Sequence, residues 1–383
     1  MPGAPGDKRV ASDGVPGSWE EARNVLCVRL DTLGDVLMTT PAIRALRESR
    51  ADRRLTLLTS SSGAEVASLV PEIDETIVYD APWLKATASR DGTAYDHAMI
   101  ELLRRKDFDA AVVFTVYSQN PMPSVLMCYL ADIPLRLAHC RENPYQLLSH
   151  WVKETEPETQ LRHEVKRQLD LVATAGCSTD DVRLSLRIPV DSRKRVQSIL
   201  ASLSLAPEQP WVVIHPGVTA PSRRYPWEAF ADVAHHLRSE LGWEVFFTGT
   251  EQERDLVVAI QGAMDAPSYS LVGRLDLGGL AALLSYAHML ISNNTGPVHM
   301  AAAVGTPTVD LYAMTNPQHT PWGIPNRVLN HEVPCKYCYK SICPEGHYRC
   351  LRLVPPDAVI AAVVELSMET ASPRPVWEDA GEY

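Results

Sequence analysis

The sequence predicts an α/β protein built from two successive parallel sheets. Short apolar runs alternate with helical segments along most of the chain, a pattern typical of parallel strands covered by helices on both faces. The alternation occurs twice, on either side of a polar stretch at 184–195, and 383 residues suffice for two cores. We therefore expect two Rossmann-like domains facing a cleft, with ligands outside the carboxyl ends of the strands.

The composition is that of an ordinary globular chain. Hydrophobic residues make up 45% and charged residues 22%, with a net charge of −11. This charge argues against nucleic acid as a partner and gives no general attraction to an anionic membrane, although it leaves room for local peripheral contact. The N-terminus lacks the apolar core of a signal peptide, and no run is long enough to span a bilayer. We expect a cytoplasmic protein without a transmembrane segment.

Residues 1–20 are rich in Gly and Pro and predict a disordered leader before the first domain, 21–188. Each expected strand is a short apolar run, and each expected helix is longer, the last ending at Gly176. The less regular segment 137–152 is expected to form loops and short helices beside the cleft. The predicted strands are 24–30, 54–60, 74–80 and 108–115, and the predicted helices are 34–49, 63–70, 95–106 and 163–176.

The second domain, 189–357, repeats the pattern after a predicted linker at 184–195. Its Cys-rich segment is 335–350, and a last helix at 355–370 leads into the tail, so that 358–383 form a separate terminal region. The predicted strands are 211–217, 244–250, 288–294 and 307–313, and the predicted helices are 192–205, 226–241, 251–264, 277–287 and 296–305.

The strongest ligand signal is the stretch 292–307. Asn294 or Thr295 can cap the following helix, Gly296 allows close approach of a ligand, and Pro297 suits the first helical turn. Exposed N–H groups at such a helix start bind phosphate, although many capped helix starts hold no ligand. Neither a G-x-G-x-x-G nor a Walker A motif is present, which lowers the expectation of a nicotinamide cofactor.

A second signal follows the strand at 211–217. Two arginines, Arg223 and Arg224, come just before a helix, near His215 and Gly217 at the same strand end. A pair of guanidiniums there can hold a diphosphate through charge-assisted hydrogen bonds. The alternative is a solvated arginine pair, with His215 in a structural role.

A third signal is the acid at the first strand-to-helix turn. Asp35 follows Gly34, and Asp31 and Thr32 belong to the same loop, which we assign to the acceptor side. The helix dipole favours an acid at Asp35 and lowers its pKa, so this residue is either a cap or a catalytic base. Asp31 is the competing candidate for the base.

Four of the eight cysteines crowd together with the spacing C-x2-C-x4-C-x6-C. Four thiolates so close in sequence can bind one structural zinc ion or an iron–sulfur cluster, with His347 able to replace one sulfur. Two local disulfides and a loop of free thiols are the alternatives. The four candidate ligands are Cys335, Cys338, Cys343 and Cys350.

Four stretches, at 28–46, 212–233, 245–253 and 290–312, together resemble the heptosyltransferases of glycosyltransferase family 9. The resemblance implies a GT-B fold whose C-terminal helix packs back onto the first domain. It also implies inverting transfer of a sugar, foremost heptose from ADP-heptose, to a hydroxyl of a glycan, glycolipid or natural product. No cofactor is then required for catalysis. The rivals are a nucleotide-sugar 2-epimerase-like isomerase and a non-catalytic nucleotide-sugar-binding protein.

The resemblance also implies roles for single residues. Asp35 matches the catalytic base, and Arg223 matches a basic residue that acts on the donor phosphates. Asn294 stands where the family commonly has Asp, which would mark a decayed site in a non-catalytic protein. The remaining donor-side candidates are Arg224, the phosphate-binding turn Thr295, Gly296 and Pro297, and Glu251 with Thr250 for the nucleotide's ribose.

Overall fold

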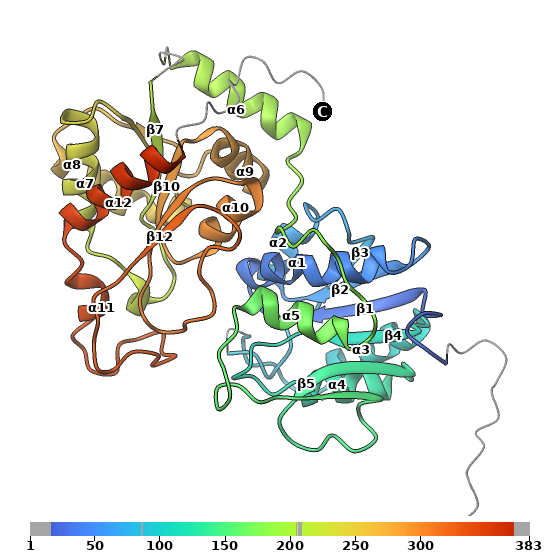
Figure 1. The fold of residues 1–383 in the computed structure, drawn as a ribbon. Coiled ribbons are helices and arrows are strands. Elements are labelled where there is room, and N and C mark those ends of the chain that lie inside the picture. The colour runs from blue at the N-terminus through green and yellow to red at the C-terminus, as the bar shows by residue number, and fades with distance from the viewer. Residues whose placement is uncertain (1–16, 86, 204, 206–208, 371–383) are drawn as a thin grey trace, which may run out of the picture.

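The computed structural model describes residues 17–85, 87–203, 205 and 209–370. They form two six-stranded sheets, ordered β3-β2-β1-β4-β5-β6 and β12-β11-β10-β7-β8-β9, with every strand pair parallel. If the strands of the second sheet are numbered from β7, both sheets have the same strand order, read from opposite edges. The predicted pair of Rossmann-like α/β domains is therefore confirmed. Figure 1 shows the two domains side by side.

The first sheet is built from short buried strands. β1 and β2 are almost wholly buried because helices cover both faces, which is why they read as continuous apolar runs. The strands are β1 (Asn24–Arg29), β2 (Arg54–Thr59), β3 (Glu75–Val78), β4 (Ala110–Val113), β5 (Leu135–Cys140) and β6 (His150–Lys153). The helices are α1 (Leu33–Glu48), α2 (Ser61–Ala67), α3 (Ala94–Arg105), α4 (Met122–Leu130) and α5 (Glu164–Ala173).

Two expectations for the first domain were wrong. The segment 137–152 contributes to β5 and β6 rather than forming only loops and short helices, and its polar residues hid this. Arg136 is buried in β5, where its Nε donates to the Leu147 carbonyl at 2.6 Å. The leader was drawn too long, because Trp19 is buried in the core and its carbonyl accepts from Arg53 Nη2 at 2.5 Å. Residues 1–16 lie outside the described residues.

The second domain repeats the arrangement. Its strands are β7 (Trp211–His215), β8 (Glu244–Phe247), β9 (Tyr269–Ser270), β10 (Met289–Asn293), β11 (Thr308–Leu311) and β12 (Asn326–Leu329). Its helices are α6 (Val190–Ser202), α7 (Trp227–Ser239), α8 (Arg254–Met264), α9 (Leu277–Tyr286), α10 (Gly296–Val304), α11 (Arg349–Arg352) and α12 (Pro356–Glu369), with 3-10 turns η1 (Pro221–Arg223) and η2 (Glu251–Glu253). None of the described helices combines the length and apolar character that a bilayer span requires.

The last helix corrects a further expectation. α12 packs against α7, β11 and β12 of the second domain, as Figure 1 shows, and not against the first domain. Its apolar residues Val359, Val363 and Leu366 recur at helical spacing and belong to the core of the second sheet. Residues 371–383 lie outside the described residues.

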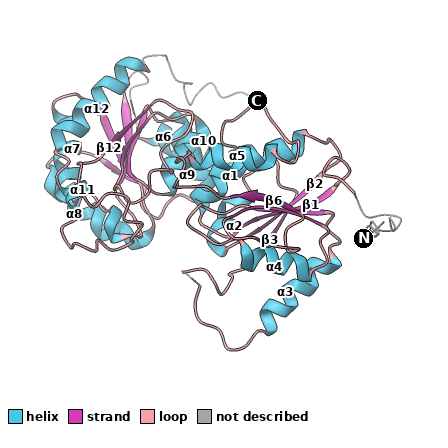
Figure 2. Ribbon diagram, turned by 60° about the horizontal axis from the view of Figure 1, so that its bottom comes forward, coloured by secondary structure: helices cyan, strands magenta, loops and turns pink. Residues whose placement is uncertain are grey.

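The two domains contact each other through α1 and α10, which lie close together in Figure 2. Apolar residues of both helices belong to one buried cluster. The segment after β11 also reaches the first domain, where Gln318 Nε2 donates to Glu156 Oε2 at 2.7 Å and to the Arg162 carbonyl at 2.9 Å. Because α1 follows β1 and α10 follows β10, the loops after these two strands meet where the two helices touch.

Candidate active site

A buried arginine organises the loop that follows β1. Arg29 is fully buried, and its guanidinium lies 3.1 Å from Asp31, 3.1 Å from Asp35 and 2.8 Å from Glu164. One guanidinium therefore faces three carboxylates. Because the three carboxylates share one positive charge in a buried place, their pKa values are expected to differ from one another.

Asp35 is both a cap and a partner of Arg29. Its Oδ2 accepts from the Thr32 backbone N–H at 3.1 Å and from the Thr32 hydroxyl at 2.7 Å, as the acid of a capping box does. Its Oδ1 faces Arg29. Burial opposes ionisation, but Arg29, His319 and the Thr32 hydrogen bonds hold the pKa of Asp35 below its ordinary value. Asp35 is therefore ionised at neutral pH.

Asp31 lies beside Asp35 but differs from it in pKa. Burial raises its pKa to about 6, with Arg29 opposing the rise and the charge of Asp35 adding to it. Its Oδ1 accepts from Gln119 Nε2 at 2.6 Å. The two neighbouring carboxyls thus differ in proton affinity, and Asp31 is the stronger base of the two.

The loop after β7 supplies one cation to this region. Arg223 is half-buried, forms no ion pair with the described residues, and its charge helps to lower the pKa of both His299 and His319. Arg224 is exposed. His215 is buried, and its Nδ1 lies 3.0 Å from the Thr248 hydroxyl. The two arginines therefore differ in their exposure to solvent.

The loop after β10 meets α1 directly. A Cβ on Gly296 would lie 3.1 Å from Leu33 Cδ2, and one on Gly34 would lie 2.6 Å from His299 Cδ2. Glycine is needed at Gly34 because the ring of a second-domain histidine occupies the space of a side chain. Thr295 precedes the first residue of α10, and Pro297 lies in its first turn, as predicted. The predicted phosphate-binding turn therefore lies against the start of the helix that carries Asp35.

Asn294 has a carboxyl partner on the neighbouring strand. Its Nδ2 donates to Asp310 Oδ2 at 2.9 Å and to the His319 carbonyl at 3.0 Å. Asp310 is fully buried, which raises its pKa to about 8, and its Oδ1 has no hydrogen-bond partner among the described residues. A carboxyl is therefore present beside this loop, although it comes from β11.

The ribose candidates lie at another strand end. Glu251 is exposed and pairs with Arg254 at 2.5 and 2.6 Å, and the Thr250 N–H donates to Glu253 Oε2 at 2.7 Å. The Glu253 carboxylate fills the space beside Gly217, where a Cβ would lie 1.7 Å from Oε1. No described contact joins Glu251 to Arg223 or Asp35. These residues share the carboxyl-end edge of the second sheet with the other donor-side candidates.

Four participants were not singled out from the sequence. Arg29 ends an otherwise apolar strand, which is a detectable signal because a buried charge requires a partner. His299 and Asp310 lie within the stretch 290–312 but belong to no phosphate-binding pattern. His319 follows β11 and has its pKa lowered by burial, while the charges of Asp35 and Glu164 oppose this effect.

The four clustered cysteines line one cavity. Together with His347 they border a small cavity of about 20 Å³, and Cys335 Sγ lies 3.6 Å from His347 Nε2. All eight cysteines of the chain are free of disulfides. Burial raises the pKa of Cys343, but N–H groups of Tyr348 and its neighbours outweigh this and lower it. In the described part of the chain, no three ligand side chains are gathered as closely as a bound metal would hold them.

The fold and site define a two-domain transferase of the GT-B class. Residues 97–349 match the model of glycosyltransferase family 9 (heptosyltransferase), and the chain belongs to this family of glycosyltransferases. It is 26% identical over 293 residues to lipopolysaccharide heptosyltransferase 3 of Escherichia coli, covering 74% of this chain and 81% of that protein.

Two solved structures show the same fold. A family 9 glycosyltransferase from Veillonella parvula gives a TM-score of 0.75 at 23% identity, over 92% of this chain and 98% of that one. The E. coli ADP-heptose LPS heptosyltransferase II gives 0.69 at 22% identity, over 91% and 100% of the two chains. The expected GT-B fold and family are confirmed.

Proposed function

We propose that this protein transfers heptose from ADP-heptose to a hydroxyl of a glycan, glycolipid or natural product, with inversion at the anomeric carbon. The observation that carries the proposal is the contact between two loops. The α1 loop carries an ionised carboxylate, and the α10 loop carries a helix start suited to phosphate, with Arg223 nearby. The names of the related heptosyltransferases support heptose as the sugar and ADP as its carrier.

In the proposed reaction, Asp35 takes the proton of the acceptor hydroxyl as its oxygen forms a bond to the anomeric carbon. The bond from that carbon to the diphosphate oxygen breaks, and its electron pair leaves with ADP. Asp35 is suited to this task because it is ionised and lies where the two domains meet. Its low pKa makes it a weak base, so departure of ADP must supply much of the driving force.

The leaving diphosphate gains negative charge as the bond breaks. Arg223, which has no carboxylate partner among the described residues, and the N–H groups at the start of α10 would stabilise that charge. Thr295, Gly296 and Pro297 would line the phosphates, and Glu251 with Thr250 would contact the ribose. Thr32 and Gly34 would fix the shape of the loop that faces the acceptor.

Asp31 is a second candidate for the base, and one observation favours it. A pKa of about 6 makes Asp31 the better proton acceptor near neutral pH. The two candidates predict different pH profiles of kcat/KM. With Asp31 as base, activity falls as the pH drops through about 6. With Asp35 as base, the fall begins at a lower pH, because the pKa of Asp35 is depressed.

The direct test measures ADP release from ADP-heptose in the presence of an acceptor panel, for wild type, Asp35→Asn and Asp31→Asn. If Asp35 is the base, Asp35→Asn lowers kcat by ~10²–10⁴-fold while ADP affinity changes little. Asp35→Ala should lose transfer as well. Full turnover in either Asp35 variant would reject this assignment, and loss only in Asp31→Asn would transfer the role to Asp31.

Analysis of the donor sugar in the same reactions separates the other reaction classes. A 2-epimerase would convert the donor sugar without acceptor and without hydrolysis, whereas a binding protein would bind ADP-heptose and leave it unchanged. Calorimetry with ADP, GDP, UDP and dTDP tests the nucleotide. Selective binding of UDP would contradict the ADP-heptose proposal.

We also propose that Cys335, Cys338, Cys343 and Cys350 bind one structural metal centre, either zinc or an iron–sulfur cluster. The support for this site is that the four residues line one cavity as free thiols and that N–H groups favour the thiolate of Cys343, although the thiols must move closer together to bind a metal. Elemental analysis of the purified chain should show about one metal centre per chain, lost in Cys338→Ser and retained in the control Cys177→Ser. A metal-free wild type with full stability would reject the site.

A further inference from the structure

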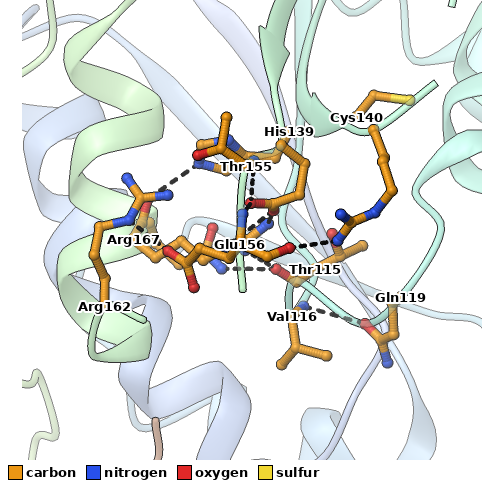
Figure 3. A network of polar contacts seen from close by, with 12 residues as sticks. Thr115, Val116, Gln119, His139, Cys140, Thr155, Glu156, Arg162 and Arg167 are labelled. Carbon is orange, nitrogen blue, oxygen red and sulfur yellow. Dashed lines mark hydrogen bonds and ion pairs between the residues drawn. The ribbon is translucent and has the colours of Figure 1, made fainter. Parts of the chain in front are cut away.

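The first domain contains a second cavity, of about 170 Å³ and open to solvent, at the carboxyl ends of β4, β5 and β6. Its lining comes from 117–121, 139–142 and Glu154. Figure 3 shows part of this region, with Gln119 on one side and His139, Thr155 and Glu156 facing Arg167. Ligands of open parallel sheets bind at this edge.

Gln119 connects this cavity to the acidic loop. Its Oε1 accepts from the Val116 N–H at 3.3 Å, and its Nε2 donates to Asp31 Oδ1 at 2.6 Å. Asp31 shares Arg29 with Asp35. The cavity therefore begins one hydrogen bond away from the carboxylates proposed to act on the acceptor hydroxyl.

His139 forms the buried side of the cavity and carries no charge there. The residue is 4% exposed, and its Nε2 lies 3.3 Å from the Arg167 carbonyl, so that nitrogen carries the proton and donates. Burial and the charge of Arg167 lower the pKa of His139 to about 4, which keeps the ring neutral. The cavity therefore gains no positive charge from this residue.

The charges around the cavity are already paired, with one exception. Arg141 binds Glu158 at 2.8 and 3.0 Å, and Glu154 accepts from Arg167 Nε at 3.2 Å and from two backbone N–H groups. Glu142 is exposed and has no ion-pair partner in the described part of the chain. The uncompensated charge of the lining is therefore negative.

We propose that this cavity binds a neutral, hydroxyl-rich part of the sugar acceptor and excludes phosphorylated ones. The inference rests on the proposed glycosyl transfer. Hydroxyl groups can donate to Glu142, and they can exchange hydrogen bonds with the exposed side chains of Ser118 and Asn120. A phosphate would find no free guanidinium there and would be repelled by Glu142.

The test measures saturation-transfer NMR of the full-length protein with two matched probes, mannose and mannose 6-phosphate. The neutral sugar should bind the wild type, and the phosphorylated sugar should bind at least about fivefold more weakly. Glu142→Lys should reverse this order. Ser118→Trp, an exposed position that can fill the cavity, should abolish binding of the neutral sugar.

Glu48→Lys is the matched control, because it makes the same change of charge at the exposed end of α1, away from the carboxyl ends of the strands. It should leave the preference unchanged. Stronger binding of mannose 6-phosphate by the wild type, no effect of Glu142→Lys, or unchanged binding in Ser118→Trp would overturn the proposal. ADP titrated into the same samples tests the donor domain separately, so a failed donor function and a failed acceptor cavity are distinguishable.

Discussion

Arg223 and Arg224 are adjacent in the sequence but differ in their surroundings. Arg223 is half-buried near the loop after β10, whereas Arg224 is exposed. We expect Arg223→Ala to weaken ADP binding by about tenfold or more, because a charge-assisted hydrogen bond contributes ~1.5–3 kcal/mol. Arg224→Ala is the matched control and should change the affinity less than about twofold. Calorimetric titration with ADP checks both, and equal losses would reject the separation.

Asp310 predicts a pH-dependent stability. Its pKa is about 8 in the folded chain against an ordinary value of 3.8, so the folded state keeps a proton that the unfolded chain releases. The stabilisation is complete below about pH 4 and is lost as the pH rises through about 8, by at most ~1.4 kcal/mol per pH unit. Asp310→Asn stays neutral and removes this dependence.

Urea unfolding at about pH 5, 6.5 and 8 measures this effect. The stability of Asp310→Asn relative to wild type should increase from the lowest pH to the highest. Asp31 contributes a slope of the same sign to both proteins and therefore cancels in the difference. A constant difference across the range would show that Asp310 titrates normally.

At the scale of elements, the contact between α1 and α10 depends on one glycine. A methyl group on Gly34 would lie 2.6 Å from His299 Cδ2, so Gly34→Ala must displace the buried His299 ring or move the two helices apart. We expect a loss of ~1–3 kcal/mol in stability, as for overpacking elsewhere, together with lower kcat/KM. Gly262→Ala, in α8 where a Cβ meets nothing within 4 Å, is the control and should stabilise by ~0.5–1 kcal/mol. Thermal unfolding and initial rates measure both.

The strand and helix patterns predict most elements because the buried strands read as apolar runs. β5 was not predicted because Arg136 and His139 interrupt its apolar run, and the partners of Arg136 Nε and His139 Nε2 cannot be read from the sequence. The loops after β1, β7 and β10 were predicted as sites from their residues. The pairing of Asn294 with Asp310 was not predictable, because it depends on the register of two neighbouring strands.

At the scale of the whole molecule, the segment after β11 joins the two domains. Gln318 is 1% exposed and is the partner of Glu156 Oε2, which is itself buried. Gln318→Ala should cost ~1–3 kcal/mol, because it leaves that oxygen without a donor. Gln261→Ala, which removes a hydrogen bond to Ser268 within the second domain, should cost less than ~1 kcal/mol. Urea unfolding compares them, and equal small losses would reject a bridging role for Gln318.

The sequence also could not predict which domain the last helix packs against or how the two domains contact each other. The apolar stripe of α12 fits any complementary surface, and only the shape of the second core explains why it packs against α7. Likewise, His319 reaches the acidic loop only because its segment crosses between domains. Sequence patterns predict each sheet, but contacts between sheets depend on side chains that are far apart along the chain.

The Asn294–Asp310 pair also bears on how this loop should be compared with the loops of other chains. An acid at 294 alone would place two buried carboxyls side by side, and loss of the acid at 310 alone would take away a partner of Asn294. The two positions therefore have to be considered together, because position 294 taken by itself misses the carboxyl that β11 supplies beside the loop.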